Sequence, residues 1–122
     1  MKQRRSTEDY LKTIYILSRE GPVRGAEIAT RLHLSRPTVS VSLKALEEEG
    51  QIRMHPDHRV SLTEQGEAIA REIYDRHQMF RELLICLGVD EAAANRDACE
   101  LEHSVGPEST AAFRAALARM KE

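Results

Sequence analysis

The sequence contains no tryptophan, and aromatic residues make up only 4% of its 122 positions. This scarcity argues against an aromatic-rich β-sandwich or a sugar-binding surface. The two cysteines, Cys86 and Cys99, are too few for a disulfide framework, so we expect both to stay reduced. No apolar run approaches the length of a membrane span, and the N-terminus MKQRRSTEDY lacks the apolar middle of a signal peptide. We therefore expect a cytoplasmic protein that does not interact with membranes.

Several signatures of catalysis are also missing. The chain has no HExxH helix of a metalloprotease, no nucleophile elbow, and no glycine-rich loop that could hold a phosphate. We therefore expect that the protein is not an enzyme. A small metalloenzyme remains the alternative from a different class, with a metal-bound water as its reactive group.

The charge is distributed unevenly along the chain. The net charge is −2, but residues 1–62 hold 11 Lys/Arg against 8 Asp/Glu, whereas residues 63–122 hold 7 against 12. The first half is thus basic by three charges and the second acidic by five. Such an asymmetry favours a polyanionic partner for the first half.

Hydrophobic periodicity and turn residues predict a mainly α-helical chain with one hairpin. We expect helices over 6–20, 25–32 and 36–49, strands over 51–54 and 59–63, and further helices over 64–87, 90–104 and from 107 towards the C-terminus. Three helices followed by a hairpin are typical of a winged helix-turn-helix. The predicted domains are therefore a winged helix-turn-helix over 1–63 and a helical dimerisation domain over 64–122.

The third predicted helix has the composition of a DNA-recognition helix. Val39, Leu43 and Leu46 have the spacing of a buried face, which leaves small polar side chains facing outward, where they can approach base edges in a major groove. Arg59 on the hairpin is suited to phosphate contacts. The candidate DNA-binding residues are Ser35, Arg36, Pro37, Thr38, Ser40, Lys44 and Arg59. The alternative is a helical bundle whose Ser/Thr-rich helix simply faces water.

The second half contains a possible metal-binding cluster. Cys99, Glu102 and His103 have the i, i+3, i+4 spacing that places three donor side chains on one helical face. His77 falls on an otherwise apolar stripe of the preceding helix. Asp9 is a fifth candidate. Each has a structural alternative: a buried cysteine, a solvated glutamate, core histidines, and a capping box of Ser6 and Asp9.

Several segments resemble the diphtheria-toxin-repressor/manganese-transport-regulator (DtxR/MntR) family over nearly the whole chain. The segments are STEDYLKTIYIL, EIATRLHLSRPTVSVSLKALEEEGQI, VSLTEQGEAIA, and RHQMFRELLICLGVD through DACELEHSV. The resemblance implies a homodimeric, metal-sensing transcriptional repressor that binds a palindromic operator. Its corepressor would be Fe(II) or Mn(II). The chain resembles the short form without an SH3-like C-terminal domain.

The resemblance also assigns ligand positions. Asp9 falls where the manganese branch has an Asp ligand, and Cys99 where the iron branch has a Cys. His77, Glu102 and His103 match ligand positions of the family, so the set resembles a hybrid of the two branches. Where further ligands stand in relatives, this chain has Lys12, Arg81 and Asn95. These departures put a second metal in question.

The implied mechanism is an assembly switch. One cation held by Asp9 on the first helix and by donors after the hairpin would fix the DNA-binding half, and metal would favour that state only through its differential affinity. We expect dimerisation through apolar residues of the last helices: Leu84, Leu87, Phe113, Leu117 and Met120. The main alternative is a metal-independent or small-molecule-sensing winged-helix regulator in which the Cys/Glu/His cluster is structural. Survival of DNA binding in a chelator would distinguish it.

Overall fold

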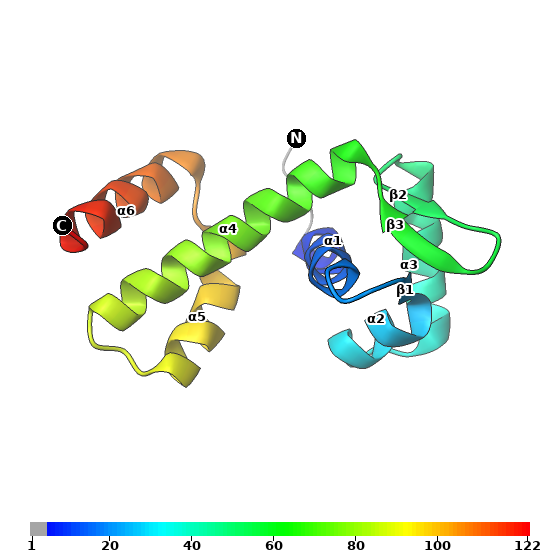
Figure 1. The fold of residues 1–122 in the computed structure, drawn as a ribbon, viewed down its shortest axis with the longest axis horizontal. Coiled ribbons are helices and arrows are strands. Elements are labelled where there is room, and N and C mark those ends of the chain that lie inside the picture. Colours follow the sequence, from blue (N-terminus) through cyan, green and yellow to red (C-terminus); the bar gives the residue numbers. More distant parts are fainter. Residues whose placement is uncertain (1–4) are drawn as a thin grey trace. The chain divides into compact units, whose positions relative to one another are not determined.

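The computed structural model describes residues 5–122. Figure 1 shows its elements in chain order, which are α1 (Arg5–Ser18), β1 (Val23–Arg24), α2 (Gly25–Leu32), α3 (Arg36–Glu48), β2 (Ile52–Met54), β3 (Arg59–Leu62), α4 (Glu64–Cys86), α5 (Glu91–Ser104) and α6 (Pro107–Met120). The chain divides into two compact units, the first ending at Arg71 and the second running from Glu72 to Glu122. Among the described helices none is long and apolar enough to cross a membrane.

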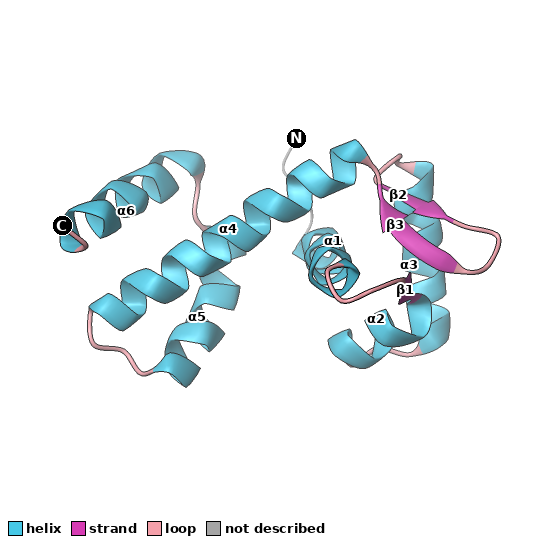
Figure 2. Cartoon of the chain, in the orientation of Figure 1, coloured by secondary structure: helices cyan, strands magenta, loops and turns pink. Residues whose placement is uncertain are grey.

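The first unit is a helix, a helix-turn-helix and a small antiparallel sheet, so the predicted winged helix-turn-helix is confirmed. The strand order is β1-β3-β2, and Figure 2 shows the two strands of the hairpin in magenta. Strand β1 was not predicted. It consists of two residues and pairs Val23 with Val60 of β3. A strand of two residues is too short to leave an alternating pattern in the sequence.

One contiguous core holds the first unit together. Each helix turns its apolar stripe inward, and the hairpin closes the core with alternate residues. The fully buried side chains include Leu11, Ile14, Ile28, Val39, Leu43 and Ile52. The buried face predicted for the third helix is confirmed, because Val39, Leu43 and Leu46 are all 4% exposed or less.

The junction between the hairpin and α4 is held by contacts that Thr63 and Gly66 make with neighbouring backbone groups. Thr63 caps the helix, because its Oγ1 accepts a hydrogen bond from Gly66 N at 3.2 Å and itself donates to the carbonyl of Gly50 at 2.7 Å. Gly66 lies directly against the carbonyl oxygen of Gln51, and a Cβ at this position would overlap that oxygen. A glycine is therefore required where α4 begins to pack on the loop before β2.

The second unit consists of the later turns of α4 together with α5 and α6. Its core is formed by Met79, Phe80, Leu83, Ala98 and Leu117, and the rings of Phe80 and Phe113 meet edge to face with centroids 5.6 Å apart. Leu117 thus belongs to the unit's own core, which corrects its assignment to a dimerisation face. Cys86 is exposed at the last turn of α4. The helix ends there, and Gly88 then takes a left-handed conformation with φ 97°.

Candidate metal centre and nucleic-acid interface

Three of the predicted metal donors meet within the second unit. The donor atoms of His77 on α4 and of Cys99 and Glu102 on α5 all lie within 4.8 Å of one another. His77 Nδ1 is 3.1 Å from Glu102 Oε2 and 3.7 Å from Cys99 Sγ. An imidazole, a carboxylate and a thiol at this separation form a mixed donor set for a divalent transition metal.

His103 lies beside this cluster, next to Glu102. Glu102 is 1% exposed, and its second oxygen, Oε1, lies 3.2 Å from Nε2 of the buried His103. The helical spacing of α5 places both residues beside Cys99 on one face, as the sequence predicted. A buried carboxylate between two imidazoles is a donor set that a bound cation fits.

Asn95 orients the imidazole of His77. Asn95 Oδ1 lies 3.2 Å from His77 Nε2. When Nε2 donates to this carbonyl oxygen, Nδ1 is the ring nitrogen that faces Glu102 and Cys99 and that a metal could bind. Metal-binding histidines generally have such an outer partner on the second ring nitrogen. Sequence reasoning noted Asn95 only as a departure from a ligand pattern and missed this contact.

Asp9 lies on α1 of the first unit and is half-buried. Ser6 lies inside the helix and not before it, so the predicted Ser6–Asp9 capping box is wrong. The capping box is therefore not the role of Asp9. Its role as a metal ligand stays a prediction.

The positions that could supply a second metal are occupied differently. Arg81 Nη2 is paired with Glu91 Oε1 at 2.8 Å, which places a cation where a further ligand would be needed. Asn95 is engaged by His77. The two positions therefore do not offer the donors that the resemblance would require for a second metal.

The predicted DNA-binding residues lie exposed on the first unit. Helix α3 begins with Ser35 as its N-cap, whose Oγ accepts from Thr38 N at 3.3 Å and donates to Thr38 Oγ1 at 2.7 Å. Ser35, Arg36, Pro37, Thr38, Ser40 and Lys44 are all exposed. Arg59 is exposed on β3, but its Nε lies 2.6 Å from Asp57 Oδ2, so this carboxylate offsets part of its charge.

One further cation, Arg24, borders this surface. A groove of about 480 Å³ is lined by Arg24 before α2, Arg36 and Ser40 on α3, and Met54 and His58 on the hairpin. His58 takes a left-handed conformation with φ 69° at the hairpin turn. Arg24 was missed, because the strand that holds it was not predicted.

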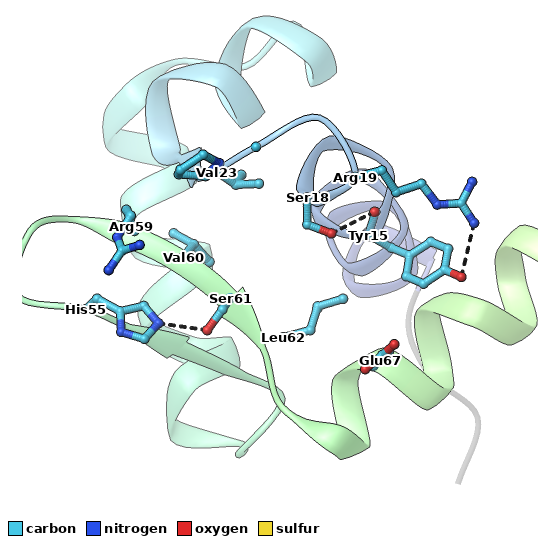
Figure 3. A pocket seen from close by; sticks show the side chains of 12 residues that line it. Tyr15, Ser18, Arg19, Val23, His55, Arg59, Val60, Ser61, Leu62 and Glu67 are labelled. Carbon is cyan, nitrogen blue, oxygen red and sulfur yellow. Dashed lines mark hydrogen bonds between the residues drawn. The ribbon is translucent and has the colours of Figure 1, made fainter.

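A second cavity, of about 510 Å³, lies between the end of α1, the sheet and the start of α4 (Figure 3). Two hydrogen bonds join polar side chains that line this cavity. His55 Nε2 is 2.8 Å from Ser61 Oγ, and Arg19 donates to the phenol oxygen of Tyr15 at 3.2 Å. This bond from Arg19, with a second from Arg71, lowers the pKa of Tyr15 below its usual range. No predicted metal donor lines this cavity.

Comparison with known families matches nearly the whole chain. Residues 3–60 match the iron dependent repressor N-terminal DNA binding domain, and residues 63–122 match the iron dependent repressor metal binding and dimerisation domain. The two matches meet where the hairpin ends and α4 begins.

Individual relatives agree with this result. The chain is 42% identical over 113 residues to the transcriptional regulator MntR of Escherichia coli O6:H1, covering 92% of this chain and 73% of the relative. It is 40% identical over 101 residues to the iron-dependent repressor IdeR of Mycobacterium bovis, covering 80% of this chain and 44% of the relative.

Among solved structures, a manganese-dependent transcriptional repressor in complex with manganese is similar with a TM-score of 0.84 at 30% identity, over 92% of this chain and 52% of that one. The chain thus spans about three quarters of MntR and about half of the other two proteins. These matches show that the chain belongs to the iron-dependent repressor family, whose members are metal-dependent, DNA-binding transcriptional regulators and not enzymes.

Proposed function

We propose that this protein is a transcriptional repressor for metal homeostasis whose corepressor is a single Mn(II) or Fe(II) ion. The observation that carries the proposal is the buried carboxylate of Glu102, which lies between the imidazoles of His77 and His103. A site of this kind gains most from a cation, which both compensates the buried charge and binds the neutral imidazoles.

The proposed ligands are His77, Cys99, Glu102 and His103 of the second unit and Asp9 of the first. His77 would bind through Nδ1, because Asn95 occupies Nε2. The bound metal would supply positive charge and directional bonds, and the chemical type of the ligand residues would determine which metal is preferred. The thiolate of Cys99 raises affinity for Fe(II) and later metals, whereas the two carboxylates keep Mn(II) favourable.

The metal would act on DNA binding by favouring one state of the chain. In the absence of metal, the carboxylates of Asp9 and Glu102 do not favour a shared site, since like charges repel. A cation held by both would restrict the DNA-binding unit to the arrangement that binds DNA. The shift in population is then limited by the difference in metal affinity between the two states.

The DNA would be bound by α3 in the major groove. Arg36, Pro37, Thr38 and Ser40 would lie nearest the bases, with Ser35 at the start of the helix, Lys44 further along its outer face and Arg59 on phosphates. Two copies of the chain would bind a palindromic operator with half-sites about 34 Å apart or at a multiple of that distance. Large apolar side chains left exposed in the second unit support a dimer: Ile85, Leu87, Phe113 and Met120.

The competing function is a winged-helix regulator that needs no metal. DNA binding in the presence of a chelator separates the two, measured by fluorescence anisotropy on duplexes selected from a random pool. The proposal expects tight binding with Mn(II) or Fe(II) and weak binding with chelator. Equally tight binding in both would overturn it.

The two cysteines provide a matched pair of variants. Cys99→Ser removes the proposed thiolate ligand and should weaken metal-dependent binding, whereas Cys86→Ser changes the other exposed cysteine, which is outside the cluster. Equal behaviour of the two variants would exclude Cys99 as a ligand.

A further inference from the structure

Val41 is the most exposed of the large hydrophobic residues in the described chain, with 72% of its surface accessible. Single exposed apolar side chains are common on proteins, so exposure alone indicates no function. The position is what distinguishes Val41, because it lies in the middle of α3, the helix proposed for base recognition. It was not among the residues predicted to face outward.

The helical geometry places Val41 at the centre of the exposed face. Successive residues of an α-helix are about 100° apart, and the buried Val39, Leu43 and Leu46 define the side that faces the core. The opposite direction falls within roughly 15° of Val41. Pro37, one turn before Val41, and Lys44, one turn after it, are exposed as well. The isopropyl group of Val41 therefore lies at the centre of the face of α3 that points away from the core.

The major groove offers one apolar group that fits such a side chain. Cytosine, adenine and guanine present hydrogen-bond donors and acceptors there, whereas thymine presents a C5-methyl group beside its O4. Val41 has no polar atom, so it would bury the polar edge of another base without a partner, which is unfavourable. The methyl of thymine loses contact with water when it packs against the isopropyl group, which is favourable.

We propose that Val41 is a specificity-determining residue that reads a thymine methyl group in each operator half-site. The inference rests on the proposed function of α3 as the recognition helix. The cations Arg36 and Lys44, exposed on the same helix, are of the sign that a flanking phosphate backbone attracts.

The test removes the methyl from the DNA and the isopropyl from the protein. Duplexes that bind the wild-type chain with Mn(II) are first selected from a random pool. Each thymine is then replaced singly by deoxyuridine, which lacks only the C5-methyl group. For the wild type, one thymine per half-site should show a loss of about fourfold in affinity, the change that corresponds to burial of one methyl group.

Val41→Ala should bind the parent duplex more weakly and lose the penalty for deoxyuridine at that thymine, while penalties at other thymines stay unchanged. Leu34→Ala is the matched control, because Leu34 is also an exposed apolar residue of this unit but lies before α3. Leu34→Ala should keep the deoxyuridine penalty.

Three results overturn the inference. No sensitive thymine in the wild type, or the same penalty in Val41→Ala, excludes methyl reading by Val41 while DNA binding itself stands. Failure to select any duplex, with or without Mn(II) or Fe(II), overturns the proposed function together with this inference.

Discussion

Nδ1 of His77 lies 3.1 Å from Oε2 of Glu102, so a histidine of α4 meets the most deeply buried carboxylate of α5. The pair links the two helices at the point where the sequence predicted metal ligands.

Replacement of Glu102 by Gln keeps the shape of the side chain and removes its charge. We expect metal affinity to fall by at least ~100-fold, more than the loss of an outer partner costs, because the variant loses both a ligand and the compensating negative charge. Titration calorimetry with Mn(II) measures the change. Glu100→Gln, an exposed neighbour on α5, is the control. Equal affinities in the two variants would exclude Glu102 as a ligand.

Asn95→Ala tests the orientation of His77. Without the amide oxygen beside Nε2 the ring loses the partner that holds Nδ1 towards the other donors, and metal affinity should fall by roughly 10–100-fold. Titration calorimetry with Mn(II) measures the change. Asp97→Ala, another exposed position of α5, should leave the affinity unchanged. An unaltered affinity in Asn95→Ala would contradict this role of Asn95.

Thr38→Ala removes a hydroxyl at the start of α3. If this hydroxyl contacts a base, affinity for the selected operator should fall by about 1–3 kcal/mol, with little change on random DNA. Competition anisotropy on both duplexes gives the comparison. Thr30→Ala, on the exposed side of α2, provides the control. Equal losses on operator and random DNA would show that Thr38 supports only backbone contacts.

Gly66→Ala tests the junction between the hairpin and α4. The added Cβ overlaps the Gln51 carbonyl, so the free energy of unfolding should fall by roughly 1–3 kcal/mol, the usual cost of overpacking. Urea denaturation measures it. Gly25→Ala is the matched control, because a Cβ there makes only ordinary contact with Leu43 at 3.6 Å. A Gly66→Ala variant as stable as the Gly25→Ala variant would contradict the close packing.

The helices with clear capping or terminating residues could be predicted from the sequence. Helix α2 has the predicted bounds, and α3 begins at the predicted residue 36, directly after its cap Ser35. The spacing of Cys99, Glu102 and His103 was sufficient to place them on one helical face. Local periodicity and capping determine these features, so they can be predicted from a single sequence.

Other features depend on contacts between distant residues and could not be predicted in this way. Strand β1 exists only through its pairing with β3, and the contact of Asn95 with His77 depends on how α4 packs on α5. Leu117 was misassigned because an apolar stripe does not show which partner covers it. Val41 could have been found, since a helical projection places it opposite the buried residues.

The proposed function requires that metal binding and DNA binding be coupled in this chain. The most direct measurement is the dissociation constant for a selected operator duplex with saturating Mn(II) and with chelator, paired with Mn(II) affinity with and without the duplex. Because coupling is reciprocal, the two ratios must agree, and we expect both to be roughly 5–150-fold. A ratio of one in both directions would show that the His77–Glu102 cluster does not regulate DNA binding.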